Sequence, residues 1–284
     1  MLKRLLCVPT IALALLGPTT GDAKAWGPDG HRIVAEIAFK LLPPHKAAAI
    51  DQLLRNSTLR VGFIEASIYA DLVIRQQNEK FDPWHFVNWT ISEPYSDQFC
   101  KKPKEEELTC IIAQLPIQIK EAGSNADPNA RALAISWVIH LIGDLHQPLH
   151  VGDKKDGGGN GFPVTYRGKN TCGPPAFPLA MTEVQLHRVW DHCLVYDLVD
   201  GREWWRVADE IRGGLTTYKG QASAAGDSTD WARQTNDLAR DYVYQGIERR
   251  DDLDAAYIVR AMAVVREQLL RAGIRLARVL DEIY

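Results

Sequence analysis

The sequence predicts an all-α protein, a mainly helical single domain. Apolar residues recur at helical spacing (i, i+3, i+4) over most of the chain, and strand-like alternation is limited to 162–167, after a glycine-rich turn. A predicted signal peptide of 25 of the 284 residues leaves about 259, enough for one large or two small domains. Because no linker or internal repeat divides them, we expect one domain with a small β-hairpin near 160–168.

Residues 1–25 have the features of a cleaved signal peptide. Two basic residues precede an apolar run over 5–16, and a small-x-small sequence typical of a cleavage site ends at Ala25. The run is shorter than the roughly 20 residues that span a bilayer, and no later stretch reaches that length. We therefore expect an exported protein, periplasmic or secreted and not inserted in a membrane, whose mature chain (26–284) begins at Trp26.

Several stretches with helical spacing follow. Pro43 ends the first of them, because proline cannot continue a helix. Asp127 is a suitable N-cap for a helix that Pro148 ends, and the last helix is long, with one apolar stripe over 258–274. The expected helices cover, in chain order, 31–42, a stretch near 45–55, 63–77, 128–147, 179–199, 202–213, 229–245 and 252–282.

The mature chain is acidic. The whole chain carries a net charge of −3 and the signal peptide +2, which leaves −5 for the mature side chains. This balance argues against non-specific binding of duplex nucleic acid by a broad basic face. It does not exclude a small cationic site, because bound metal ions supply positive charge that a residue count omits.

Four cysteines remain after cleavage: Cys100, Cys110, Cys172 and Cys193. An even number in an exported chain predicts two disulfides rather than free thiols. The sequence allows three pairings, of which we favour Cys100–Cys110 and Cys172–Cys193. A cysteine-ligated zinc site is disfavoured, because the chain has no CxxC pair.

Two His–Asp pairs dominate the polar residues. His140 and Asp144, and likewise His187 and Asp191, are four residues apart, so on a helix each pair lies on one face. Imidazole nitrogen and carboxylate oxygen are zinc ligands where thiolates are absent. Further His and Asp residues lie among apolar or aromatic neighbours, where a carboxylate needs a partner. These further candidates are His31, Asp71, His85 and His150.

Taken singly, each candidate has a simpler explanation. A lone histidine is more often a hydrogen-bonded core or surface residue, and an i,i+4 pair can be a surface ion pair that contributes little to stability. The concurrence of five His and three Asp favours a polynuclear metal site and a metal-dependent hydrolase. We expect His45, His146 and His192, which have no such pairing, to support the site or to lie at the surface.

In series, these residues resemble a known family. The motifs are Trp26, His31, Ala70-Asp71, Trp84-His85-Phe86, His140-x3-Asp144-x5-His150, Gly158-Gly159-Asn160 and His187-x3-Asp191. They resemble the trinuclear-zinc, single-strand-specific nucleases of fungi, plants and bacteria, the S1/P1 (S-one/P-one) nucleases. Each motif alone is weakly specific, whereas the ordered series covers essentially the whole mature chain.

The resemblance implies three Zn²⁺ ions per chain. One zinc would be held by Asp71, His85, His140 and Asp144; a second by the α-amine and carbonyl of Trp26 with His31 and Asp144; and the third by His150, His187 and Asp191. Asp144 would then bridge two ions. An α-amine, with its reference pKa near 8, can lose its proton to a metal, so removal of the signal peptide would complete the site.

The resemblance also implies a reaction and substrates. The expected enzyme is a zinc-dependent endonuclease that cleaves single-stranded DNA and RNA to 5′-nucleotides through a metal-activated water, and that also acts on 3′-nucleotides. Asp71, Asp144 and Asn160 would be catalytic, with Asp71 orienting the water and Asn160 holding the phosphate. Phe86 would stack on an unpaired base.

Two positions depart from the family pattern. Fungal members have an Asp where this chain has Asn88, and several members have an Arg where this chain has Ile74, followed by Arg75. We expect both Asn88 and Arg75 to contact substrate. Two alternatives stay open, a zinc-dependent phospholipase C and a non-catalytic exported zinc protein. A monomer is expected.

Overall fold

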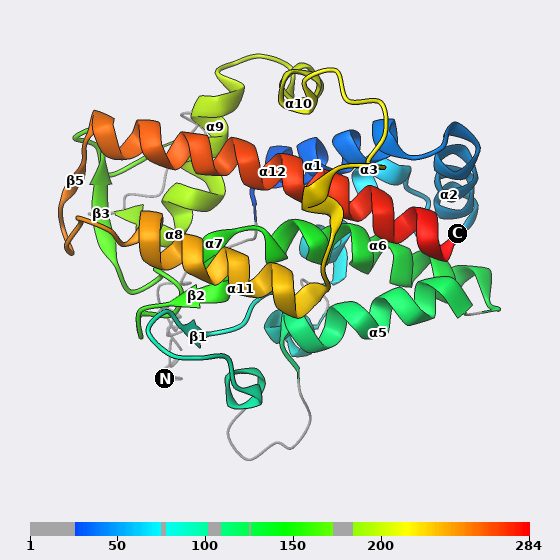
Figure 1. Ribbon diagram of the computed structural model, residues 1–284, viewed down its shortest axis with the longest axis horizontal. Coiled ribbons are helices and arrows are strands. Elements are labelled where there is room, and N and C mark those ends of the chain that lie inside the picture. The colour runs from blue at the N-terminus through cyan, green and yellow to red at the C-terminus, as the bar shows by residue number, and fades with distance from the viewer. Residues whose placement is uncertain (1–25, 75–77, 102–108, 125, 173–183) are drawn as a thin grey trace, which may run out of the picture.

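The computed structural model describes residues 26–74, 78–101, 109–124, 126–172 and 184–284, and it is mainly helical (Figure 1). The α-helices are α1 Pro28–Leu41, α2 Pro44–Asn56, α3 Phe63–Ala66, α5 Ile111–Ser124, α6 Pro128–Leu145, α7 Pro148–Val151, α8 Leu186–Arg188, α9 Leu194–Val199, α10 Trp204–Arg212, α11 Ser228–Leu238 and α12 Ala255–Ile283. The predicted fold class is confirmed. Among the described residues, no helix combines the length and apolar character needed to cross a bilayer.

Helix α6 lies at the centre of the fold. Every residue from Ala134 to Leu145 is buried, and α6 packs against α5, α12 and α1. Figure 1 shows α12 crossing the molecule, and it packs along α1 as well. The predicted start of α6 is confirmed, because the Asp127 side chain accepts a hydrogen bond from Asn129 N and caps the helix. Because α5, α12 and α1 pack around α6, the polar residues in its second half are buried between helices.

The expected helices at 31–42, 45–55, 128–147 and 202–213 are present with small shifts at their ends, and that at 229–245 is α-helical to Leu238 and then continues as a π segment to Val243. Three others differ. The 63–77 helix is interrupted after Ala66, and its last residues, 75–77, lie outside the described part of the chain. The 179–199 stretch is described only from Val184, and its first two described residues form a strand. The last helix begins at Ala255 rather than at 252.

One long helix was not anticipated from the sequence. Helix α5 runs from Ile111 to Ser124 with Pro116 inside it and packs along α6. Proline is disfavoured within a helix because it removes a hydrogen bond and crowds the preceding turn. Buried Ile111, Ile112 and Leu115 contribute the apolar surface that stabilises α5 against the core.

Three helical segments have the wider π spacing, in which hydrogen bonds join residues five apart. They are η1 Ala70–Ile74, η4 Val189–Cys193 and η6 Ala239–Val243. The first two contain Asp71 and Asp191, both predicted metal ligands. Single π turns often mark functional sites, because the extra residue redirects a side chain out of the regular helical pattern. Short 3-10 helices cover η2 Glu79–His85, η3 Asp97–Cys100 and η5 Ala222–Ala224.

The strands are short and distant in sequence. They are β1 Trp89–Thr90, β2 Gly152–Asp153, β3 Pro163–Tyr166, β4 Val184–Gln185 and β5 Asp252–Leu253. The predicted strand near 162–167 is present as β3, which pairs antiparallel with β4 and parallel with β5. At its end a tight turn is closed by a bridge between Tyr166 and Lys169. Strands β1 and β2 pair in parallel.

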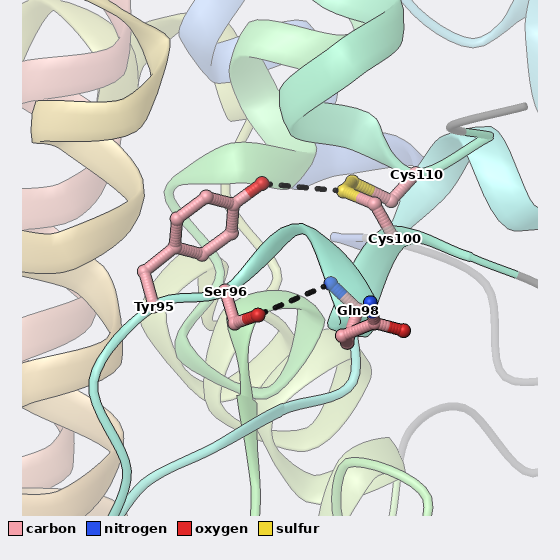
Figure 2. The surroundings of a disulfide bond; sticks show 5 residues. All are labelled: Tyr95, Ser96, Gln98, Cys100 and Cys110. Atoms are coloured by element: carbon pink, nitrogen blue, oxygen red, sulfur yellow. Dashed lines mark hydrogen bonds between the residues drawn. A yellow bond between two sulfur atoms is a disulfide. The ribbon is translucent and has the colours of Figure 1, made fainter.

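Both favoured disulfides are confirmed, Cys100–Cys110 and Cys172–Cys193. Figure 2 shows the first, with Tyr95 Oη 3.5 Å from Cys100 Sγ. A disulfide sulfur carries no proton, so Tyr95 is the donor. In the same turn, the Ser96 hydroxyl accepts a hydrogen bond from Gln98 N at 3.4 Å. The Cys100–Cys110 disulfide thus joins the last residue of η3 to the residue that precedes α5.

A buried network lies under the C-terminal end of α6. His146 Nδ1 donates to Ile142 O at 2.7 Å, and Arg275 Nη1 donates to His146 Nε2 at 2.7 Å. Burial, with the charge of Arg275, holds the pKa of His146 well below its ordinary value, so the ring is neutral. The expectation that His146 supports the site is consistent with this position, next to the helix end that carries Asp144.

Candidate metal centre

The i,i+4 pair on α6 forms the middle of the site. His140 and Asp144 are both 0 % exposed, and His140 Nε2 lies 3.1 Å from Asp144 Oδ2. The predicted same-face arrangement is confirmed. Because α6 is enclosed along this stretch, both polar side chains face other helices rather than solvent.

Helix α1 contributes His31. Its Nε2 lies 3.2 Å from Asp144 Oδ1, and its ring stacks on that of His140 with centroids 4.2 Å apart. This close approach depends on Gly143, because a Cβ there would lie 2.7 Å from His31 Nδ1. Gly143 was not singled out from the sequence. A glycine inside a helix is normally unfavourable, so its presence within the expected helix 128–147 could have indicated a close approach of another group at this position.

Asp71 and His85 complete this side of the site. His85 Nδ1 lies 3.0 Å from Asp144 Oδ2 and 2.9 Å from His140 Nε2. Asp71 Oδ1 lies 3.7 Å from both His85 Nδ1 and His140 Nε2. The two oxygens of Asp144 therefore face different groups, Oδ1 facing His31 and Oδ2 facing His85 and His140.

A separate cluster is formed by His150, His187 and Asp191. His187 Nε2 lies 3.0 Å from Asp191 Oδ2, and His150 Nε2 lies 3.8 Å from Asp191 Oδ1. The π segment η4 carries Asp191, and the short helices α7 and α8 carry the two histidines. We call this group the third cluster.

Backbone carbonyls orient three of the imidazoles. His140 Nδ1 donates to Ser67 O at 2.7 Å, His150 Nδ1 to His85 O at 2.7 Å, and His187 Nδ1 to Gly158 O at 2.6 Å. In each case Nδ1 keeps its proton for the carbonyl, so Nε2 is the nitrogen that faces the cluster and can bind a metal in place of a proton. The bond from His150 to His85 also links the third cluster to the group formed by His31, Asp71, His85, His140 and Asp144, which we call the α6 site.

The carboxylates of Asp144 and Asp191 are ionised despite their burial. Burial acts to raise the pKa of Asp144 and of Asp191, but the neighbouring imidazoles outweigh it, so both pKa values lie below the ordinary range. At His140 burial acts to lower the pKa, but Asp144 and Asp71 outweigh it and raise the pKa to about 9. A cation bound here would take the place of a proton.

The donor set fits zinc. Among the described residues, His150 Nε2 is buried without a hydrogen bond, and His31 Nε2 and Asp144 Oδ1 approach each other at 3.2 Å, an arrangement that costs stability unless a ligand compensates it. In each of three groups, the donor atoms lie within 4.8 Å of one another. The groups are His31–His140–Asp144, Asp71–His85–His140 and His150–His187–Asp191. Imidazole and carboxylate donors in compact sets are typical of zinc sites.

The glycine-rich loop borders the third cluster. Gly158 and Gly159 have φ angles of +61° and +82°, and a Cβ on Gly158 would lie 2.3 Å from Leu149 O. Only glycine tolerates both conditions, so the loop lies close enough for Gly158 O to accept the bond from His187. Asn160 is exposed on the same loop, and its Nδ2 donates to Gly157 O at 2.9 Å.

Two aspartates that sequence reasoning missed shape this loop. Asp153 Oδ1 accepts from Gly158 N at 3.1 Å, and Asp156 Oδ1 accepts from Gly159 N at 2.7 Å. Tyr244 donates to Asp156 Oδ1 at 2.9 Å, since burial raises the pKa of this phenol and keeps it protonated. The spacing of small turn residues between aspartates was the signal that could have identified them.

The remaining predicted residues take varied positions. Phe86 is half-buried and Asn88 exposed on the segment after His85, and Phe86 is not among the described side chains that pack against the core. Arg75 lies outside the described residues. Trp26 is buried, and the next residue, Gly27, donates from its N to Asp191 O at 2.7 Å.

Of the other histidines, His45 is exposed on α2. His192 is half-buried, and its Nδ1 would lie 2.6 Å from a Cβ on Gly27. Neither belongs to the three groups of possible metal ligands among the described residues.

The helical fold and the three clusters of His and Asp residues agree with the class that the sequence predicts, a metal-dependent hydrolase. The family profile described as S1/P1 Nuclease matches residues 26–284. The chain is 28 % identical to Nuclease S1 of Aspergillus oryzae, with 99 % of this chain and 98 % of that protein aligned. It is 26 % identical to Endonuclease 2 of Arabidopsis thaliana, with 91 % and 90 % aligned. The chain belongs to the S1/P1 nuclease family.

Membership of this family identifies the enzyme class. A further relative, Nuclease P1 of Penicillium citrinum, is 23 % identical, with 91 % of this chain and 98 % of that protein aligned. The protein is a hydrolytic nuclease that acts on phosphodiester bonds. The family match disfavours both alternatives, the phospholipase C and the non-catalytic zinc protein. The match also begins at Trp26, the residue predicted to follow signal cleavage.

Proposed function

We propose that this nuclease is an exported, zinc-dependent endonuclease that hydrolyses single-stranded DNA and RNA to 5′-nucleotides and also acts on 3′-nucleotides. The observation that carries the proposal is the convergence of buried His and Asp donors in three groups. The division into a signal peptide (1–25) and a nuclease domain (26–284) is part of the proposal, as is a monomeric state. Elemental analysis of the mature protein should give three zinc ions per chain.

We assign the donors as the sequence predicts. Asp71, His85, His140 and Asp144 would hold one zinc; the Trp26 amine and carbonyl, His31 and Asp144 a second; and the third cluster a third. The bridging role of Asp144 is supported by its two oxygens, which face different histidines. The place of Trp26 beside His31 is supported by the bond that His31 N donates to the O of the next residue, Gly27, at 3.3 Å.

The bound ions would lower the pKa of a water and offset charge on the phosphate. The protein's own residues have three tasks. Asp71, at the edge of the α6 site, accepts a hydrogen bond from the attacking water and orients it. Asn160, exposed on its loop, donates its amide hydrogen to a phosphate oxygen. Gly158 O accepts a hydrogen bond from His187 Nδ1 at 2.6 Å and so fixes the orientation of that ring. This bond positions the loop that carries Asn160 and the third cluster together.

Preference for single strands is assigned to Phe86. Its ring is half-buried and is not among the described side chains packed on the core, and we assign one of its faces to an unstacked base. Stacking accepts any base but requires that the base be unpaired. Asn88 can both donate and accept hydrogen bonds, so it relaxes base preference relative to an Asp. Arg75 is assigned to the phosphate backbone of the substrate.

The decisive experiment offers the zinc-loaded mature protein single-stranded DNA, duplex DNA, RNA, a 3′-nucleotide and phosphatidylcholine in parallel. We expect 5′-nucleotides from the single strands, phosphate release from the 3′-nucleotide, and loss of both after chelation with recovery on adding zinc. Release of diacylglycerol without nucleotides would establish the phospholipase alternative. A zinc-loaded protein inactive on every substrate would establish the non-catalytic one.

Replacing Tyr244 by Phe tests the role of the loop. The change removes only the hydroxyl that donates to Asp156 Oδ1 at 2.9 Å, and we expect a loss of about 1 kcal/mol in the free energy of unfolding. Because that bond holds the Asn160 loop, KM for an oligonucleotide should rise several-fold.

Tyr218→Phe is the matched control, since its hydroxyl also donates to a carboxylate, that of Asp281, at the other end of the fold. It should lower stability comparably and leave KM unchanged. Equal KM values for both variants would show that the Tyr244 bond does not position the loop.

A further inference from the structure

Gln147 is a buried amide that lies among the proposed ligands without being one. Its side chain is 0 % exposed, and it caps the N-terminus of α7. Asp144 precedes it by three residues and His150 follows it by three. A fully buried amide in such a short turn must have all its polar atoms paired, or the fold loses stability.

Each polar atom of Gln147 has a partner. Oε1 accepts from Leu149 N at 2.6 Å, and Nε2 donates to Asp191 Oδ1. The backbone N donates to Asp144 O at 2.9 Å, and the backbone O accepts from His150 N at 3.0 Å. The orientation of the amide is fixed, because a backbone N–H only donates and an ionised carboxylate only accepts.

The bond to Asp191 determines how this carboxylate is presented. Gln147 donates to Oδ1, which also lies 3.8 Å from His150 Nε2, whereas Oδ2 lies 3.0 Å from His187 Nε2. With Oδ1 held, the carboxylate cannot rotate about its Cβ–Cγ bond without breaking a buried hydrogen bond. Oδ2 therefore stays directed at the third cluster, and Gln147 couples that carboxylate to the helix end that bears His150.

We propose that Gln147 is a positioning residue that sets the zinc affinity of the third cluster by holding Asp191. This inference rests on the proposed function, since it requires zinc at His150, His187 and Asp191. Removing a hydrogen bond to a metal-binding side chain typically lowers metal affinity by about 10- to 100-fold. The same loss is expected here, and the α6 site, which Gln147 contacts only through backbone, should keep its affinity.

The test is Gln147→Ser in the full mature protein. Serine still caps α7 but is too short to reach Asp191, so the cap is retained and the carboxylate bond lost. Zinc per chain is measured after dialysis against graded concentrations of a chelator. We expect the variant to fall from three ions to two at a chelator concentration about 10- to 100-fold lower than the wild type requires. Gln147→Asn, one methylene shorter, should behave alike.

The matched control is Asn236→Ser. Asn236 is also a buried amide, but it donates only to backbone carbonyls, to Trp89 O at 3.0 Å and Val151 O at 3.1 Å. It should keep wild-type zinc retention while losing comparable thermal stability. The inference is overturned if both Gln147 variants retain three ions like the wild type, or if neither folds. A wild-type protein that holds no zinc would instead refute the proposed function itself.

Discussion

Asp144→Asn is expected to abolish hydrolysis of single-stranded DNA and to leave the protein short of two zinc ions. Asn keeps the size of the side chain but not its charge, and its nitrogen cannot serve as a ligand in place of a carboxylate oxygen. Asp144 Oδ1 lies 3.2 Å from His31 and Oδ2 3.0 Å from His85, so one substitution affects both groups. Removing one stabilising donor from an active site costs about 10²- to 10³-fold, and the loss of a bridging ligand should exceed that.

The measurements are zinc per chain and the initial rate on denatured DNA. Asp281→Asn is the control, because Asp281 is also an ion-paired carboxylate, 2.8 Å from Lys46, but lies far from the clusters. It should lower stability and keep full zinc content. An Asp144→Asn protein that retains three ions and measurable turnover would show that Asp144 is not a bridging ligand.

Adding one glycine before Trp26 is expected to remove most of the activity without unfolding the protein. The extension converts the free α-amine into an amide, which has no basic lone pair for a metal. Trp26 is fully buried and Gly27 is hydrogen-bonded to Asp191 O, so the new residue also enters a packed region. We expect zinc affinity at the site of His31 to fall by at least about 10-fold.

The control carries the same glycine after Tyr284, which follows the end of α12. A second arm uses an extension that a specific protease removes, and cleavage back to Trp26 should restore activity. If the extended protein is fully active before cleavage, the α-amine is not a ligand and signal removal is not an activation step.

Features that depend on residues close in sequence could be predicted well. The His140–Asp144 pair follows from α-helical geometry alone, and the Asp127 cap follows from its chemistry. The His187–Asp191 pair was also expected from its spacing, but the structure forms it through the π segment η4. The approach of His31 to Asp144 spans 113 positions, and no spacing rule implies it. Only the resemblance to a family did so.

Other features lay beyond periodicity. Helix α5 was missed because Pro116 is a helix breaker in isolation, whereas packing on α6 overrides that preference. The partners of β3 come from 184–185 and 252–253, which are helical in spacing when considered alone. Gln147 was missed because an uncharged amide before a proline is explained by capping, and its bond to Asp191 exists only in the folded chain.

The π turns make the length of the chain as important as its composition. Deleting Val189 would restore the tighter α turn and place Asp191 three rather than four positions after His187, and each residue of an α-helix turns by about 100°. His187, upstream of the deletion and anchored to Gly158, would stay in place while the carboxylate turned away from Gln147. A one-residue deletion that changes no ligand would thus dismantle the third cluster as surely as replacing Asp191.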